Sequence, residues 1–317
     1  MDSSPSVSVG VAIYNKEKVL RRCLDSLKNQ SLQDIEFILV DDGSTDGSRA
    51  ICEEYSKADP RFKTISTPNG GLGKARQTAL NNARGEYIIH CDADDWVEPT
   101  AYEKAYKTAK EKNADVVIFN FFKDNDATGE SSESNFQTSE TESSRILLKL
   151  LLNNNNSSWG KLVRMSVIKE NGLYFEPGIN SGEDALFTCK VLSSGPLKVE
   201  FINDCLYHYC YDPEANSLSH YYNLATIHNQ IFILDWMIAN INYGELESLV
   251  WHSRIGKVSI ILRSKEYDGK LFSDYMKRYL PWKTFRKVPV SLKWFIALFA
   301  KIFGIKFTYK LIHAIKK

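Results

Sequence analysis

Three aspartates lie within four positions directly after an apolar segment. Asp92, Asp94 and Asp95 follow the run Tyr87-Ile-Ile-His-Cys. Alternate residues of an extended chain point to the same side, so Asp92 and Asp94 can reach one point. Carboxylates that close repel each other unless a cation lies between them, and hard oxygen ligands suit Mn²⁺ or Mg²⁺. The cluster therefore predicts a metal site for a phosphate-bearing substrate, although an isolated D-x-D also occurs in solvated acidic turns.

The elements that must position this cluster alternate between strand and helix over residues 1–120. Apolar runs predict strands at residues 7–13, 35–40, 62–66, 86–91 and 116–121. Amphipathic or capped segments between them predict helices, for example over residues 16–29 and 100–112. This order predicts an α/β fold with a Rossmann-like, doubly wound and mainly parallel sheet.

Aspartates also follow a second predicted strand. Asp41 and Asp42 come after residues 35–40, as Asp92 and Asp94 come after their own strand. Ligands bind beyond the carboxyl ends of the strands in sheets of this kind. We therefore expect the two acidic groups to converge on one site.

The pattern changes further along the chain. Residues 124–144 are polar and poor in large apolar side chains, so we expect a mobile surface excursion there. From about residue 221 the apolar residues follow helical periods only. We therefore expect a catalytic domain over residues 1–220 and a helical C-terminal region over residues 221–317.

The composition is that of a folded globular protein, with 43% hydrophobic and 25% charged residues among 317. Six cysteines are scattered without a C-x-x-C pair, which argues against a zinc site and indicates a reducing compartment. The first residues contain no secretory hydrophobic segment. The expected location is the cytoplasm.

Five motifs occur in a fixed order along the chain. They are Val7–Asn15, Val40–Asp46, Asn69–Arg76, Asp92–Asp95 and Gly182–Asp184. In this order they resemble bacterial family 2 glycosyltransferases, which are inverting, metal-dependent enzymes of the GT-A fold. The resemblance covers residues 6–215. Ala12 departs from it, since the family often has a proline there.

The resemblance implies a nucleotide site at the first strand ends. The nucleotide-binding residues that it implies are Ala12, Tyr14, Asp41, Asp42, Gly71, Arg76 and Asp92. Asp41 would accept a hydrogen bond from the uracil, and the guanidinium of Arg76 suits a phosphate or a base carbonyl. Gly71 allows close approach of the backbone. The alternative for Asp42 is a plain turn with a helix cap.

The resemblance also assigns the metal and the catalytic base. It places Asp94 on the metal, Asp92 at the ribose, and Asp95 near the sugar hydroxyls. Asp184 becomes the general base and Glu183 positions the acceptor or the sugar. Taken alone, Glu183 and Asp184 could equally be an ordinary acidic helix start.

Two further aromatic motifs remain open. Trp159 could stack on an acceptor sugar or pack beneath its loop. His208 lies in the run Tyr207-His-Tyr, and some relatives place a histidine of this region on the metal or the diphosphate. A lone histidine in such a run is more often structural.

A basic tail occupies residues 275–317, with eleven Lys and Arg, ten aromatic residues and no Asp or Glu. The rest of the chain carries a net charge of −10. The longest apolar stretch, residues 294–300, is far shorter than the roughly 20 residues that span a bilayer. A basic segment with aromatic anchors is typical of a helix lying in the membrane interface, so we expect peripheral binding to the anionic inner face of the cell membrane. Packing on the acidic body is the alternative, and no nucleic-acid module accompanies the tail.

Together the motifs predict an inverting glycosyltransferase that moves a sugar from a UDP-sugar to a hydroxyl of a glycan or lipid-linked acceptor, in cell-surface polysaccharide or glycoconjugate synthesis. A nucleotidyltransferase is an alternative, but its Gly-rich signature is absent from residues 14–17. A non-catalytic scaffold that binds sugar nucleotides is another, although such a protein would not need Asp184 beside the D-x-D cluster.

Overall fold

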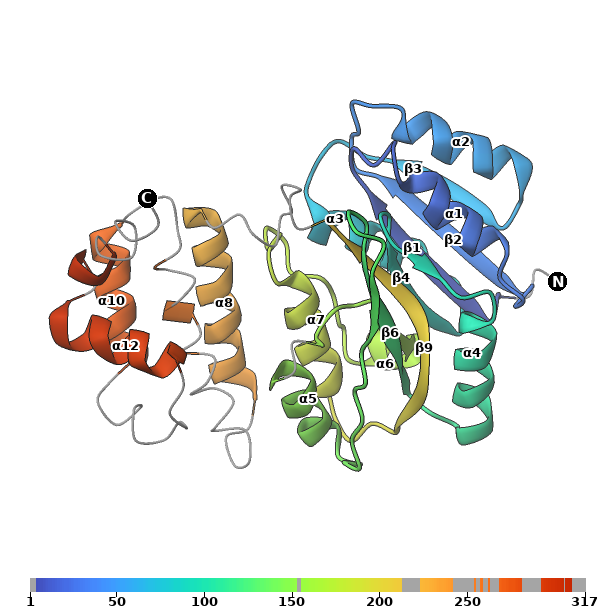
Figure 1. The fold of residues 1–317 in the computed structure, drawn as a ribbon. Coiled ribbons are helices and arrows are strands. Elements are labelled where there is room, and N and C mark those ends of the chain that lie inside the picture. The colour runs from blue at the N-terminus through green and yellow to red at the C-terminus, as the bar shows by residue number, and fades with distance from the viewer. Residues whose placement is uncertain are drawn as a thin grey trace. The chain divides into compact units, whose positions relative to one another are not determined.

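The computed structural model describes residues 4–152, 155–212, 223–241, 254, 257–258, 262, 268–280, 292–304 and 306–309. The chain forms two compact units, Met1–Ala215 and Asn216–Lys317 (Figure 1). The domain boundary expected near residue 220 lies outside the described residues. The N-terminal unit contains all the motifs expected to form the site.

One nine-stranded sheet forms the centre of the N-terminal unit, in the order β3-β2-β1-β4-β8-β6-β9-β5 with β7 beside β6. The strands are β1 (Val7–Ile13), β2 (Ile35–Asp41), β3 (Phe62–Ser66), β4 (Tyr87–Asp92), β5 (Trp96–Val97), β6 (Val116–Asn125), β7 (Ser131–Glu133), β8 (Lys161–Arg164) and β9 (Val199–Tyr211). The helices of the unit are α1 (Leu20–Lys28), α2 (Ser48–Ala58), α3 (Leu72–Asn82), α4 (Ala101–Lys112), α5 (Ser143–Leu152), α6 (Met165–Glu170) and α7 (Glu183–Leu192).

The strands β3, β2, β1 and β4 run parallel, and β6 runs parallel to β9. The antiparallel strand β8 joins these two groups. In the register, Ile13 lies beside Asp41 and Ala12 lies beside Asp92. The predicted α/β class with a mainly parallel sheet is confirmed, and the two acidic strand ends are neighbours across β1.

Helices cover both faces of the parallel strands, which explains why these strands are buried (Figure 1). Alternate side chains of β2 face opposite layers. Phe37 and Leu39 pack in the core that includes α1, α2 and α4, whereas Ile38 and Val40 pack against α3. Two-sided burial of this kind requires continuous apolar strands.

Residues 124–144 contain more regular structure than we expected. The strand β6 continues to Asn125, β7 pairs with it, and α5 begins at Ser143. The segment is largely exposed, as expected of a surface excursion, but it contains strand and the start of a helix as well as loop. The strand β7 is exposed and has only polar side chains, so no apolar alternation indicates it in the sequence.

The described part of the C-terminal unit is helical, as predicted. Its longest helices are α8 (Leu224–Asn240), α10 (Gly269–Tyr279) and α12 (Leu292–Phe303). They bury a core of their own, which includes Leu234, Phe272 and Ala297. No helix among the described residues is long and apolar enough to cross a membrane.

A buried carboxylate joins β1, β2 and the end of α3. Glu36 is 6% exposed. It accepts hydrogen bonds from the Ser8 hydroxyl at 2.6 Å and from the Arg84 backbone amide at 2.7 Å. The same hydroxyl accepts one from the Gly85 amide at 2.8 Å. Glu36 thus fixes the chain where it enters β4.

Replacing Glu36 by alanine should lower the free energy of unfolding by about 2 kcal/mol, because the buried Ser8 hydroxyl and the Arg84 amide lose their acceptor. Urea denaturation followed by circular dichroism measures the loss. The control is Glu53→Ala, which removes an exposed ion pair with Arg49 and should change stability by no more than about 0.5 kcal/mol. Equal losses in the two variants would contradict this role of Glu36.

Candidate active site

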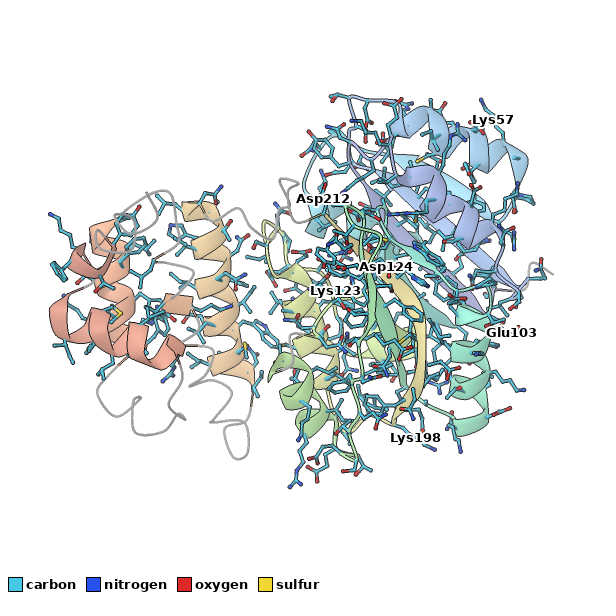
Figure 2. The ribbon with its side chains drawn as sticks, in the orientation of Figure 1. Lys57, Glu103, Lys123, Asp124, Lys198 and Asp212 are labelled. Atoms are coloured by element: carbon cyan, nitrogen blue, oxygen red, sulfur yellow. The ribbon has the colours of Figure 1, made fainter. Side chains whose placement is uncertain are left out.

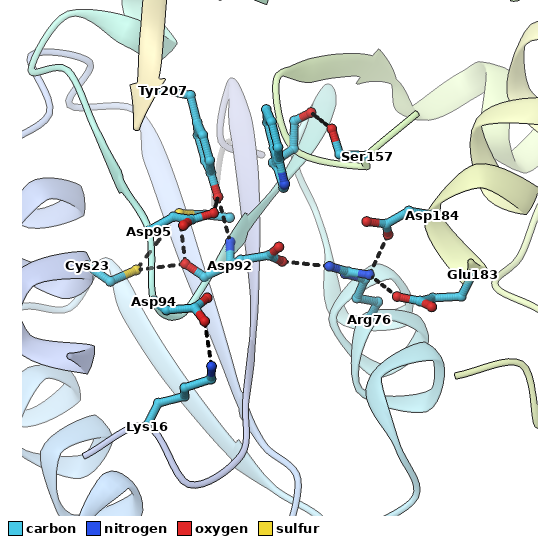
Figure 3. A network of polar contacts seen from close by, with 12 residues as sticks. Lys16, Cys23, Arg76, Asp92, Asp94, Asp95, Ser157, Glu183, Asp184 and Tyr207 are labelled. Carbon is cyan, nitrogen blue, oxygen red and sulfur yellow. Dashed lines mark hydrogen bonds and ion pairs between the residues drawn. The ribbon is translucent and has the colours of Figure 1, made fainter. Parts of the chain in front are cut away.

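A buried guanidinium lies at the centre of the site. Arg76 of α3 is 2% exposed. It donates hydrogen bonds to Asp92 of β4 at 2.6 Å, to Glu183 of α7 at 2.5 Å, and to Asp184 (Figure 3). The structure therefore brings together residues that are far apart in the sequence and that we expected at the two sides of one reaction. Because its donors are occupied by carboxylates, Arg76 positions Asp92 rather than offering a free fork to a phosphate.

Three carboxylates surround the one guanidinium of Arg76, and this arrangement shifts the pKa values of the cluster. Burial lowers the pKa of Arg76, but Asp184, Asp92 and Glu183 outweigh burial and raise it above its ordinary value. Burial raises the pKa of Glu183 to about 7, and Asp184 adds to the increase. Burial also raises the pKa of Asp92, against the effect of Arg76. Glu183 is therefore partly protonated at neutral pH.

Asp92 and Asp94 do not meet at one point, contrary to our expectation. The strand β4 ends at Asp92, and the chain then turns, with the Asp95 amide bonded to the Asp92 carbonyl at 3.1 Å. Alternation does not extend past a strand end, so Asp94 leaves the face of Asp92. Its half-exposed carboxylate pairs with Lys16 at 2.5 Å (Figure 3).

Asp95 lies beneath the turn. Its side chain is buried, and it accepts hydrogen bonds from the Tyr207 hydroxyl at 2.6 Å and from the Cys210 amide at 2.8 Å (Figure 3). The same hydroxyl accepts one from the Asp92 amide at 3.1 Å. Asp95 thus ties the acidic turn to β9, which corrects the expectation that it faces sugar hydroxyls.

The first strand ends keep two groups available for a ligand. Tyr14, which follows β1, is 47% exposed. Asp41 accepts a hydrogen bond from the Ser44 amide on one oxygen, at 3.1 Å. Its second oxygen has no hydrogen-bond partner among the described residues. Ala12 is partly exposed, and it lies beside Val40 of β2 and Asp92 of β4 in the register.

Asp42 shapes the glycine loop. It accepts hydrogen bonds from the Gly70 and Gly71 amides at 2.9 and 2.8 Å. Its oxygens are used inside the protein, which corrects the expected contact with the nucleotide and favours the turn alternative. Gly71 has φ of 88°, and a Cβ there would lie 2.3 Å from the Asn180 side chain, so only glycine fits this position.

Trp159 packs in the interior. It is 7% exposed, stacks on Tyr207 with ring centroids 4.5 Å apart, and meets Phe121 edge-on at 4.8 Å. This placement favours the packing alternative over stacking on an acceptor sugar. The indole supports the tyrosine that holds Asp95.

His208 has no nitrogen free for a metal. Asp124 lies on β6 (Figure 2). The Nδ1 of His208 lies 2.7 Å from the Asp124 carboxylate, and its Nε2 lies 3.0 Å from that of Glu98. The ring stacks between Trp96 and Phe122, with centroids 3.3 and 4.6 Å away. This placement favours the structural alternative for His208, because both nitrogens face carboxylates.

Two lysines of the site were missed by sequence reasoning. Lys16 pairs with Asp94, and Lys161 of β8 lies 5% exposed beside the helix that carries Asp184. A lysine directly after Trp159-Gly160 was the available signal for the second. Lysines are mostly exposed, so local pattern alone does not indicate a buried one.

Comparison with known proteins identifies the family. The chain matches the model of Glycosyl transferase family 2 over residues 8–172. It is 38% identical over 211 residues to EpsH of Bacillus subtilis, covering 65% of this chain and 61% of EpsH. It is 31% identical over 276 residues to the glycosyltransferase GlyA of Streptococcus pneumoniae, covering 80% of this chain and 38% of GlyA. The chain spans less than two thirds of the length of either relative. The match to the family model shows that it belongs to glycosyltransferase family 2.

A solved structure confirms the fold. Residues 1–349 of Staphylococcus aureus TarS, in complex with UDP-GlcNAc, match with a TM-score of 0.69 at 22% identity, covering 98% of this chain and 91% of that one. By sequence the chain is 32% identical to TarS over 222 residues, covering 68% of this chain and 37% of TarS. The fold is therefore GT-A, as the sequence resemblance implied.

Replacing Glu183 by glutamine should raise the Tm relative to wild type, and this difference should grow as the pH rises. The folded-state pKa is raised from an ordinary 4.5 to about 7. The stabilising effect of protonated Glu183 is therefore complete below pH 4.5 and is lost as the pH rises through about 7. Glutamine does not titrate, so the Tm difference between variant and wild type should grow across this window, corresponding to roughly 1–3 kcal/mol. Calorimetry at several pH values measures it, and parallel Tm curves would contradict the raised pKa.

Proposed function

We propose that this chain is an inverting glycosyltransferase that moves a sugar from a UDP-sugar to a hydroxyl of a glycan or lipid-linked acceptor, in cell-surface polysaccharide or glycoconjugate synthesis. The arrangement around Arg76 carries the proposal. It holds Asp92 and Asp184 on one guanidinium, so the nucleotide side and the acceptor side of the site are fixed relative to each other.

Asp184 is the base in this proposal. An inverting displacement needs a carboxylate within hydrogen-bond reach of the acceptor hydroxyl. The side chain of Asp184 is 20% exposed, whereas that of Glu183 is 6% exposed. Arg76 holds Oδ1 of Asp184, and Oδ2 has no hydrogen-bond partner among the described residues. Oδ2 can therefore receive the proton while Arg76 keeps the carboxylate oriented.

The donor is a UDP-sugar in this proposal. The unpartnered oxygen of Asp41 suits an N–H of uracil, and the exposed ring of Tyr14 suits stacking on the base. The N-terminus of α3, which follows Gly71, offers backbone amides to anionic groups. The UDP-GlcNAc complex of TarS supports this class of donor.

Asp94 suits a divalent cation. No three His, Cys, Asp or Glu side chains in the described part of the chain are placed to hold a metal. Mg²⁺ sites commonly need only one or two carboxylates, because substrate phosphates complete them. Asp94 has a half-exposed carboxylate whose one ion-pair partner among the described residues is Lys16. A cation there, Mn²⁺ or Mg²⁺, would offset charge on the departing UDP.

Replacing Asp184 by asparagine should lower UDP release from the cognate UDP-sugar at least about 100-fold, because the acceptor loses its base. The Tm increase that the donor produces with Mn²⁺ should remain, since Asp184 does not bind the nucleotide. A screen of UDP-sugars by thermal shift identifies the donor first. Asp204→Asn, at an exposed pair with Lys104, serves as control. An equally active Asp184 variant would remove the base assignment.

We also propose that the C-terminal unit binds the anionic inner face of the cell membrane. Ile302 and Phe307 are 55% and 54% exposed, and lysines flank them at positions 301 and 306. Trp282 and the other tail residues at 281–291, 305 and 310–317 lie outside the described residues. Apolar side chains next to cations suit an anionic interface.

Replacing Ile302 and Phe307 together by serine should weaken co-sedimentation with vesicles of phosphatidylcholine and phosphatidylglycerol, because both side chains lose their apolar contact with lipid. Substitution is preferable to truncation, since α12 buries Ala297 and Ala300 in the core. Pure phosphatidylcholine vesicles and the Tm of the variant are the controls. Unchanged binding with an unchanged Tm would contradict the proposal.

A further inference from the structure

One arginine joins the acidic turn to a hairpin from a distant part of the sequence. Arg22 lies on α1, and its guanidinium donates a hydrogen bond to the backbone carbonyl of Asp94 at 2.7 Å. The same guanidinium binds both carboxylate oxygens of Asp126, at 2.8 and 3.1 Å. Bidentate pairing holds a planar guanidinium in one orientation. The turn and the hairpin are therefore held by a single rigid group.

The hairpin that carries Asp126 is itself closed by backbone hydrogen bonds. It connects β6 to β7, and within it the Asn125 amide donates to the Glu130 carbonyl at 2.8 Å. The Gly129 amide donates to the Asn125 carbonyl at 2.8 Å. The Asp126 amide donates to the Tyr211 carbonyl of β9 at 2.9 Å. Asp126 thus has a fixed position from which it orients Arg22.

The helix α1 contacts the acidic turn at two consecutive residues. Next to Arg22, the buried thiol of Cys23 lies 3.5 Å from the Asp92 carbonyl (Figure 3). The Asp95 amide donates to the same carbonyl at 3.1 Å. The backbone of the turn is therefore held from α1 at both Asp92 and Asp94, while the Asp94 carboxylate stays half-exposed.

A cation site with one protein carboxylate depends strongly on where that carboxylate points. Groups behind a metal ligand that fix its orientation commonly change metal affinity by about 10- to 100-fold. Arg22 contacts the backbone of Asp94 and leaves the carboxylate free, as such a group should. The positive charge of Arg22 would by itself repel a cation, but Asp126 pairs with that charge.

We propose that Arg22 and Asp126 are positioning residues for the transfer reaction: their bidentate pair, between α1 and the β6–β7 hairpin, holds the Asp94 carbonyl and so fixes the Asp94 carboxylate for the divalent cation. The proposal rests on the proposed assignment of Asp94 to that cation. Both residues act through the turn, without contact to the cation or the donor.

The first test follows hydrogen exchange in the full-length chain, with neither metal nor substrate present. In Arg22→Met the peptide over residues 92–97 should exchange about 10-fold faster than in wild type, because the turn loses a hydrogen bond from a charged donor. Asp126→Asn should raise the rate by a smaller factor, since Arg22 keeps its bond to the turn but loses its charged partner. Mass spectrometry measures the exchange, and an unchanged rate in Arg22→Met would overturn the proposal.

The second test measures the dissociation constant of Mn²⁺ in the presence of UDP, by water-proton relaxation. Arg22→Met should weaken Mn²⁺ binding about 10-fold, because the Asp94 carboxylate loses its fixed orientation. Arg22→Lys should weaken it as well, since an ammonium cannot reproduce the bidentate fork. An arginine that acted only through its charge would give the opposite result, with tighter binding in Arg22→Met and no change in Arg22→Lys. That result would overturn the proposal.

Arg21→Met is the matched control. Arg21 precedes Arg22 on α1 and makes a bidentate pair with Glu54 of α2, at 3.0 and 2.6 Å. Its replacement should change neither the exchange of residues 92–97 nor the Mn²⁺ dissociation constant, and equal effects in the two variants would contradict a specific role of Arg22. Absence of Mn²⁺ binding by wild type would reject the cation assignment of Asp94 and this role with it. Wild-type binding that Arg22→Met leaves unchanged would reject the role of Arg22 alone.

Discussion

The buried charge of Arg76 constrains the rest of the N-terminal unit. A guanidinium that is 2% exposed remains favourable only while carboxylates surround it. Those carboxylates come from β4 and α7, and the guanidinium itself comes from α3. Three elements must therefore keep their relative positions. A Cβ added at Gly10 of β1 would lie 2.8 Å from the Cβ of Ala79 of α3, so the glycine lets α3 lie close to the sheet. The ion cluster depends on this close packing.

The same constraint separates the roles of the acidic turn. Asp92 faces Arg76, Asp94 faces Lys16, and Asp95 faces Tyr207. Each carboxylate has a different partner because the strand ends at Asp92 and the chain turns immediately. Burial and the neighbouring carboxylates raise the pKa of both Asp92 and Asp95, so these like charges still repel one another although each has its own partner. In this structure the three carboxylates of the motif therefore have three different side-chain partners.

Much of the fold follows from local sequence. The bounds of β1 and β3 agree with the predicted strands, because apolar runs ended by Asn, Asp, Gly or Pro are local signals. Sequence alone could not decide between the alternatives for Asp42, Trp159 and His208, or show the surroundings of Asp95, for a common reason. Their partners lie elsewhere in the chain, such as Tyr207 for Asp95 and Asp124 for His208. Residue type shows that a side chain can do chemistry, but only tertiary packing shows whether its polar atoms are already used.

The carboxylates of the site differ in how many of their oxygens are already hydrogen-bonded within the protein. Asp41 and Asp184 each keep one oxygen without a partner in the described part of the chain, and the side chain of Asp184 is 20% exposed. The carboxylates of Asp42 and Asp95 already accept hydrogen bonds, from the Gly70 and Gly71 amides and from the Tyr207 hydroxyl and the Cys210 amide. Buried polar groups are satisfied wherever the structure can satisfy them, so an unsatisfied one at a strand or helix end needs another partner. In the proposed reaction, the nucleotide would donate to the free oxygen of Asp41 and the acceptor hydroxyl to that of Asp184.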